Sequence, residues 1–186
     1  MMRRRFAKLI AITATPIFIV LAVQGLASHT YTQRPISELE RYVRYLRIVL
    51  PDAETFTLEK GSSRYFRGYA GNGNGGQTLV GLAFLTTDLA PFEFGYKGAI
   101  MIMVGMTTGG TITGVEVIFH NEPFGYFSID PPMFANQFKD KSILDPIEVG
   151  TDVDAVSRAT ITVRAAARSI RIAARLMIRE FLAEDR

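Results

Sequence analysis

The feature that most constrains the fold is the end of the chain, where hydroxyl-bearing residues meet a strongly helical sequence that extends from Val163 to about Glu184. Before it, the polar residues Asp154, Ser157 and Thr160 recur at every third position. Hydroxyl oxygens are favoured at a helix start because they accept hydrogen bonds from N–H groups that lack helical partners. The same N–H groups, together with the helix dipole, favour a bound phosphate. The pattern therefore predicts either an ordinary helix cap or an anion site.

The long helix is predicted to be amphipathic, with an apolar side that meets the core. The residues expected on that side are Ile170, Ala173, Ala174, Met177 and Phe181. Arginines follow one another at spacings of 4, 3, 4 and 4 and so share one face; they are Arg164, Arg168, Arg171, Arg175 and Arg179. The simplest interpretation of this face is solvation. A docking surface for an acidic redox partner or for lipid headgroups is the alternative.

Composition excludes several classes of cofactor and partner. The chain has no cysteine, so disulfides, thiolate zinc sites, iron–sulfur clusters and attached c-type haem are excluded within it. Four of the 21 basic residues and none of the 18 acidic residues lie before residue 28. The remainder therefore carries 17 basic and 18 acidic residues, and a nucleic-acid partner is not expected.

An uncharged segment near the N-terminus predicts a membrane anchor. Residues 9–27 contain no charged side chain and follow a basic start, and about 20 apolar residues span a bilayer as a helix. Because positive flanks stay in the cytoplasm, the rest of the chain is expected on the periplasmic, extracytoplasmic side of a single-pass inner-membrane protein. Residues 1–28 are then the anchor, 29–36 a linker and 37–186 the extracytoplasmic domain. A cleaved signal peptide ending near Ala27 is the alternative, although the apolar segment is longer than the usual ~7–15 residues.

The middle of the chain predicts an α+β domain. Ser37-x-x-Glu40 is a capping box that opens a helix ending at Pro51. Strands are expected at residues 65–69, 78–86, 99–106 and 112–120, and a short helix at 131–138. The glycine-rich segment 71–76 lacks the Gly-Lys-Ser/Thr ending of a nucleotide-binding loop and is predicted to be a hairpin turn.

The segment before the long helix resembles a flavinylation signature. Asp154-x-x-Ser157-x-Ala159-Thr160 is similar to the Asp-x-x-Ser/Thr-Gly-Ala-Thr motif of FMN-binding domains of the RnfG/NqrC type. The resemblance implies that Thr160, and not Thr162, carries FMN through a phosphoester bond, which a separate flavin transferase installs from FAD. It also implies a cofactor environment that includes Asp154, Ser157, Arg158, Ala159 and Thr162.

One position departs from the signature. Arg158 stands where the family usually has glycine, and glycine tolerates a positive φ and a close backbone approach better than arginine does. Arg158 therefore either hinders flavin attachment or pairs with the phosphodiester through its guanidinium group. Both interpretations stay open at this point.

Two further segments resemble the same family in the same order. Gly95-Tyr96-Lys97-Gly98 is similar to a Gly-Tyr-x-Gly turn that precedes a central strand, which implies that Gly95 and Tyr96 lie beside the flavin. The segment 120–125 contains His120, Glu122, Pro123, Phe124 and Gly125. It resembles the family's His-x-Glu-Thr-Pro-Gly loop, in the variant of NosR-type proteins. The resemblance implies that His120, Glu122, Pro123 and Phe124 line the isoalloxazine. A loop histidine that only caps the strand is the alternative, and two ligands without a third make a poor metal site.

The resemblance covers roughly residues 50–180 and implies an antiparallel sheet with packed helices that holds one FMN. It implies an electron-transfer flavoprotein that works with other redox subunits rather than a self-sufficient enzyme, and no catalytic residue set is visible. The alternatives are an accessory subunit in which the flavin is lost or loosely held, and an exported redox sensor.

Overall fold

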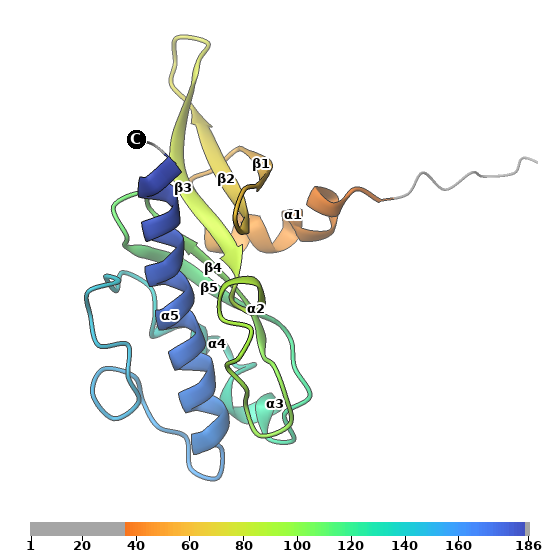
Figure 1. The fold of residues 1–186 in the computed structure, drawn as a ribbon, viewed down its shortest axis with the longest axis vertical. Helices are drawn as coiled ribbons and strands as arrows, with labels where there is room; N and C mark the ends of the chain where they lie inside the picture. The colour runs from red at the N-terminus through yellow and green to blue at the C-terminus, as the bar shows by residue number, and fades with distance from the viewer. Residues whose placement is uncertain (1–35, 185–186) are drawn as a thin grey trace, which may run out of the picture. The chain divides into compact units, whose positions relative to one another are not determined.

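The computed structural model describes residues 36–184, which form an α+β domain around one five-stranded antiparallel sheet (Figure 1). The strands pair in the order of the chain, so each strand lies beside the one that follows it. They are β1 (Thr55–Lys60), β2 (Arg64–Gly71), β3 (Gln77–Leu85), β4 (Met101–Met106) and β5 (Ile112–Phe119). The predicted fold class is confirmed for this part of the chain.

The two faces of the sheet are covered by different helices. Helix α1 (Glu38–Val49) covers one face, and α5 (Thr160–Glu184) covers the other. Side chains along a strand point to alternate faces, and β3 follows this rule: Phe84 packs in the core under α5, whereas Ala83 and Leu85 pack under α1. Three short helices complete the domain: α2 (Thr86–Leu89), α3 (Gly125–Ser128) and α4 (Pro132–Asn136).

Helix α1 begins with the predicted capping box. The Ser37 hydroxyl accepts the Glu40 N–H at 3.2 Å, and the Glu40 carboxylate accepts the Ser37 N–H at 2.7 Å. The end of α1 approaches the sheet very closely at Val49, because a Cβ on Gly105 would lie 2.2 Å from the Val49 carbonyl oxygen. Glycine is therefore required in β4 at the point where α1 ends.

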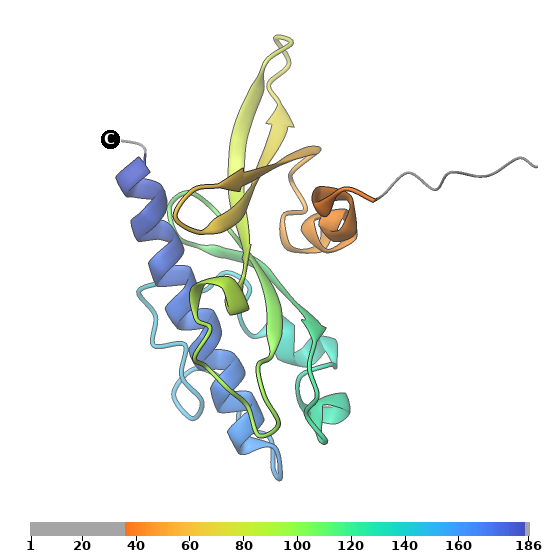
Figure 2. The same ribbon diagram turned by 45° about the vertical axis from the view of Figure 1, so that its right-hand side comes forward.

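Helix α5 begins at Thr160, three residues before the predicted start at Val163. The residues expected to meet the core are all buried, as predicted: Ile170, Ala173, Ala174, Met177 and Phe181. The first turn of α5 lies at one end of the domain, beside the loop between α2 and β4 and close to α3 (Figures 1 and 2). This arrangement gathers the three sequence motifs at that end.

The turns also follow the sequence. Segment 71–76 connects β2 to β3 as a hairpin, with the Asn72 N–H donating to the Gly76 carbonyl at 3.0 Å and with positive φ at Gly73 and Gly75. Strand β4 begins at Met101 rather than Ala99. Ala99 instead pairs with Phe94 in an isolated bridge that closes the Gly95–Gly98 turn.

The predicted anchor (1–28) and nearly all of the predicted linker lie outside the described residues. Among residues 36–184, no helix is both long enough and apolar enough to cross a membrane.

Candidate functional site

A cavity of about 610 Å³ lies where the three motifs meet. The loop between α2 and β4, the loop between β5 and α3, and the start of α5 each contribute to its wall. The lining residues are Tyr96, Lys97, Pro123, Phe124, Arg158, Ala159, Thr160, Ile161 and Thr162. Small-molecule pockets typically measure about 300–1,000 Å³, so the cavity is large enough for a cofactor.

The start of α5 provides a hydroxyl group and a set of N–H donors. The Val163 N–H donates to the Ala159 carbonyl at 3.0 Å, so the N–H groups of residues 160–162 precede the first bond of the helix and have no helical acceptor. The half-buried Thr160 hydroxyl makes only a long contact of 3.4 Å with the Val156 carbonyl. A hydroxyl group with only one weak hydrogen bond therefore belongs to the cavity wall, at the positive end of the helix dipole.

Arg158 adopts the backbone conformation that a glycine would adopt. Its φ is +70°, while Ser157 before it keeps a negative φ. The Ala159 N–H donates to the Val156 carbonyl at 3.1 Å, so residues 156–159 form a turn with the φ signs of type II, which normally places glycine at its third position. Arginine at this position therefore preserves the turn that presents Thr160.

Glu122 joins the three segments behind the cavity wall. Its carboxylate accepts the Tyr96 N–H at 2.9 Å, the Lys97 N–H at 2.7 Å and the Thr162 hydroxyl. Burial alone would raise the pKa of Glu122, but the hydrogen bonds from Thr162, Lys97 and Tyr96 outweigh burial and hold the pKa below its ordinary value. The side chain is therefore a buried carboxylate anion that connects residues 40 positions apart.

Two glycines leave room for this arrangement. A Cβ on Gly95 would lie 2.7 Å from the Glu122 carboxylate, so any larger residue would displace it. A Cβ on Gly125 would lie 2.1 Å from the His120 ring. Close packing against Glu122 and His120 thus requires glycine at these two positions, which the sequence alone does not reveal.

His120 positions the loop between β5 and α3. Its Nδ1 accepts the Glu122 N–H at 3.0 Å, and its Nε2 lies 2.8 Å from the Asp130 carboxylate. A neutral ring protonated at Nε2 satisfies both contacts. His120 does not line the cavity, so its contacts agree with the loop-capping interpretation.

The predicted site residues thus separate into three groups. Those that line the cavity are Tyr96, Pro123, Phe124, Arg158, Ala159, Thr160 and Thr162. Gly95, His120 and Glu122 lie behind the wall and support it. Asp154 and Ser157 do not line the cavity; Asp154 is exposed and borders a separate hollow beside α4. Sequence reasoning missed Lys97 and Ile161, which lie inside the motifs between residues that were singled out.

The residues present fit FMN. Tyr96, Phe124 and Ile161 are exposed apolar side chains of 62%, 43% and 60% relative exposure, and exposed apolar groups around a hollow indicate a ligand. Arg158 and Lys97 supply positive charge, and no carboxylate of residues 36–184 lines the cavity. An aromatic ring system and a phosphate are the ligand groups that such a wall would hold.

The arginine face of α5 is partly engaged by the chain itself. The Arg175 guanidinium donates to the carbonyls of Ile143 at 2.8 Å and Asp145 at 2.9 Å, and Arg171 donates to the Pro146 carbonyl at 3.1 Å.

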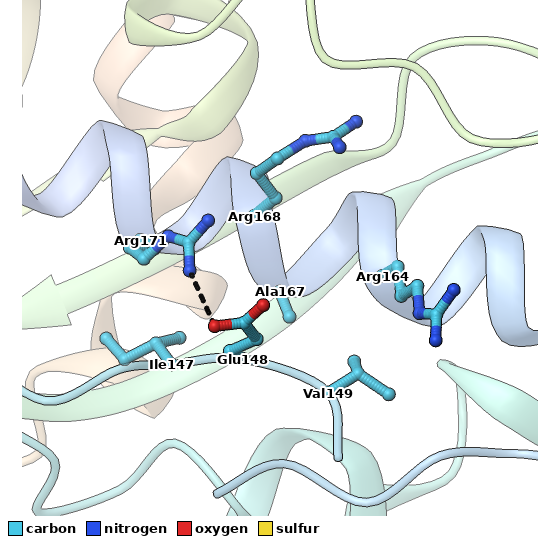
Figure 3. Close-up of a pocket in the computed structure, with 7 residues that line it drawn as sticks. All are labelled: Ile147, Glu148, Val149, Arg164, Ala167, Arg168 and Arg171. Carbon is cyan, nitrogen blue, oxygen red and sulfur yellow. Dashed lines mark ion pairs between the residues drawn. The ribbon is translucent and has the colours of Figure 1, made fainter. Parts of the chain in front are cut away.

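A smaller pocket of about 270 Å³ separates α5 from residues 147–149 (Figure 3). Figure 3 shows the Arg171–Glu148 ion pair (3.9 Å) across this pocket, with Arg168 directed away from Glu148; Arg168 instead pairs with Glu93. The face is therefore not merely solvated, because three of its five arginines fix neighbouring loops.

Comparison with known proteins places the motifs in a family. Residues 95–175 match the FMN-binding domain family. The chain is 34% identical to the G subunit of an ion-translocating oxidoreductase complex of Pseudomonas aeruginosa over 91 residues, which are 44% of this chain and 42% of that protein. It is 32% identical over 123 residues to the protein of the same name from Vibrio atlanticus, covering 61% of this chain and 56% of that protein.

A third relative comes from Clostridium ljungdahlii, where it is the G subunit of a proton-translocating ferredoxin:NAD(+) oxidoreductase complex. The identity is 28% over 134 residues, or 68% of this chain and 66% of that protein. The matched part of the chain thus spans less than half the length of the Pseudomonas relative. The match to the family begins at Gly95 and ends at Arg175, so it contains all three motifs. The predicted resemblance to FMN-binding domains of the RnfG/NqrC type is therefore confirmed: residues 95–175 match that domain family, and the similar proteins are G subunits of ion-translocating oxidoreductase complexes.

Proposed function

We propose that this protein is an electron-transfer flavoprotein that carries FMN covalently on Thr160. The observation that carries the proposal is the Thr160 hydroxyl, which lies in the wall of a cavity of cofactor size at the start of α5. Bound FMN would supply the redox chemistry, as cofactors generally do, while the chain supplies binding, orientation and electrostatics. Relatives with this domain are subunits of ion-translocating oxidoreductase complexes, which supports a role beside other redox subunits.

Each segment of the wall has a part in holding the cofactor. Tyr96, Phe124 and Ile161 offer apolar contact area for the isoalloxazine ring. The N–H groups of residues 160–162 point along the helix axis toward a phosphate esterified at Thr160. Glu122 connects the two loops to Thr162 through hydrogen bonds. These bonds would hold the residues that contact the flavin ring at a fixed position relative to the phosphoester on Thr160.

Attachment would be a phosphoryl transfer catalysed by a separate flavin transferase with FAD as the donor. The Thr160 oxygen forms a bond to the phosphorus on the FMN side of FAD, and the phosphoanhydride bond breaks. AMP leaves with the bonding electron pair, and the hydroxyl proton passes to a base of the transferase or to water. No electron is gained or lost in this step, so the flavin arrives in its own redox state.

The test is co-expression of the full chain with a flavin transferase, followed by in-gel flavin fluorescence of the denatured protein and by intact mass. We expect one FMN phosphoester on the wild-type chain and none on Thr160→Ala. Ser157→Ala is the matched control, because it removes a neighbouring exposed hydroxyl that does not line the cavity. Fluorescence that persists in Thr160→Ala would refute the assigned acceptor.

We also propose that residues 1–28 anchor the domain to the inner membrane, on the periplasmic side. The basis is the uncharged segment 9–27 behind a basic start. Membrane fractionation and the mass of the mature N-terminus decide between a retained anchor and a cleaved signal peptide. A covalent cofactor suits such a location, because dilution cannot remove it.

An accessory subunit without flavin is the alternative function, and it requires that Arg158 disrupt the signature. The backbone of Arg158 instead has the positive φ of the glycine it replaces, so the turn before Thr160 is intact. A folded but colourless protein after co-expression with the transferase would nevertheless favour the accessory role.

A further inference from the structure

One residue of the cavity wall departs from the flavinylation signature. Arg158 occupies the third position of the 156–159 turn at φ +70°. An L-residue other than Gly, Asn or Asp is uncommon there, because its Cβ crowds the backbone. Glycine would adopt this conformation without strain, but the chain has an arginine with a long cationic side chain at this position.

The Arg158 guanidinium is available to a ligand. The side chain is exposed and lines the 610 Å³ cavity, and within residues 36–184 no hydrogen bond or ion pair engages it. Three arginines of α5 differ, since Arg168, Arg171 and Arg175 are held by carboxylates or carbonyls of neighbouring loops. Arg158 therefore has no visible structural role that would offset the backbone strain.

The surroundings of Arg158 favour an anion. Lys97 lines the same cavity, and the N–H groups at the start of α5 lie two to four residues away along the chain. The Glu122 carboxylate behind the wall already accepts three hydrogen bonds from other groups. A guanidinium in such a position offers a planar pair of donors that matches a phosphate group.

We propose that Arg158 binds the phosphate of FMN and holds it beside the Thr160 hydroxyl. The inference rests on the proposed function, since it requires FMN in this cavity. The Arg158 guanidinium makes a non-covalent contact with the phosphate that a glycine at the same position cannot make. Arg158 is then a binding residue that raises affinity for a phosphorylated flavin over an unphosphorylated one.

The test compares FMN with riboflavin on the full chain purified without a flavin transferase, so that binding is reversible. Quenching of flavin fluorescence gives the two dissociation constants. We expect the wild-type protein to prefer FMN, and Arg158→Gln to weaken FMN binding about tenfold while riboflavin binding stays within about twofold; a charge-assisted contact has that order of effect. Raising the salt concentration should weaken FMN binding to the wild type more than to the variant.

Two further variants separate charge from backbone effects. Arg158→Gly should lose FMN affinity as Arg158→Gln does, yet unfold at the same or a higher temperature, because glycine accepts φ +70° without strain. Arg164→Gln removes an exposed arginine that lies outside the cavity lining, and it should bind both flavins like the wild type.

The outcomes distinguish failure of the phosphate contact from failure of the proposed function. Unchanged FMN affinity in Arg158→Gln, or an equal loss for riboflavin, would overturn the phosphate contact and leave the proposed function intact. A wild-type protein that binds neither flavin, and gains none with the transferase, would overturn both. Loss of FMN affinity in Arg164→Gln to the same degree would mean a diffuse charge effect and would also refute the specific contact.

Discussion

At the scale of the residue, the cavity depends on a single buried carboxylate. Glu122 holds two backbone N–H groups and a hydroxyl, each from a segment that forms the wall. We expect Glu122→Gln to lower the free energy of unfolding by about 1–3 kcal/mol, because an amide turns an N–H toward groups that are themselves donors. Urea denaturation measures this loss. Glu148→Gln, which changes a largely exposed carboxylate, is the control and should shift the value by less than about 0.5 kcal/mol.

The same residue predicts a pH dependence with a defined sign. The pKa of Glu122 is lower in the folded protein than its ordinary value, since its hydrogen-bond donors outweigh burial. Its contribution is therefore complete above the unfolded pKa of about 4.3 and is lost as the pH falls through the lower folded value. The stability gap between wild type and Glu122→Gln should narrow on acidification below about pH 4.3. A gap that stays constant down to the acid transition would contradict this assignment.

At the scale of the element, the arginine face of α5 stabilises the connection that leads into the site. Arg175 donates to two carbonyls of residues 143–145, so Arg175→Ala should destabilise the domain by about 1 kcal/mol and speed amide exchange in residues 142–148. Arg179→Ala, one turn further along the same face and exposed, is the matched control and should leave exchange unchanged. Equal effects of both substitutions would indicate a loss of helix charge rather than of these contacts.

The helices and turns also show which parts of the fold can be predicted from local sequence patterns. Helix α1, the 71–76 hairpin and the buried side of α5 were predicted correctly, because capping, turn chemistry and periodicity are local signals. The start of α5 was placed three residues too late, since hydroxyl caps were expected where a backbone turn at residues 156–159 opens the helix. The Glu122–Thr162 bond, across 40 residues, and the arginine contacts to the 143–146 carbonyls have no local pattern, so spacing alone did not predict them.

At the scale of the whole molecule, the cavity lies at one end of a continuous core. The three wall segments connect directly to α2, β4, β5 and α5, whose buried residues lie mainly in the core cluster between the sheet and α5. A ligand that contacts all three segments must therefore stabilise the entire domain when unfolding is cooperative. FMN at about 100 times its dissociation constant should add about 2.7 kcal/mol to the free energy of unfolding. For a domain of this size, that corresponds to a rise of roughly 5–10 °C in Tm.

The location of that stabilisation is a stricter test than its size. Hydrogen exchange with and without FMN should show slower exchange at residues 95–98, 121–125 and 158–163 together, because Glu122 ties these segments to one another. Exchange at the 71–76 turn, which projects away from the cavity end (Figure 2), should not change. In Glu122→Gln the three segments should lose their joint response, with protection confined to the start of α5. Protection that appears in only one segment of the wild-type protein would mean that the cavity does not hold the flavin as a unit.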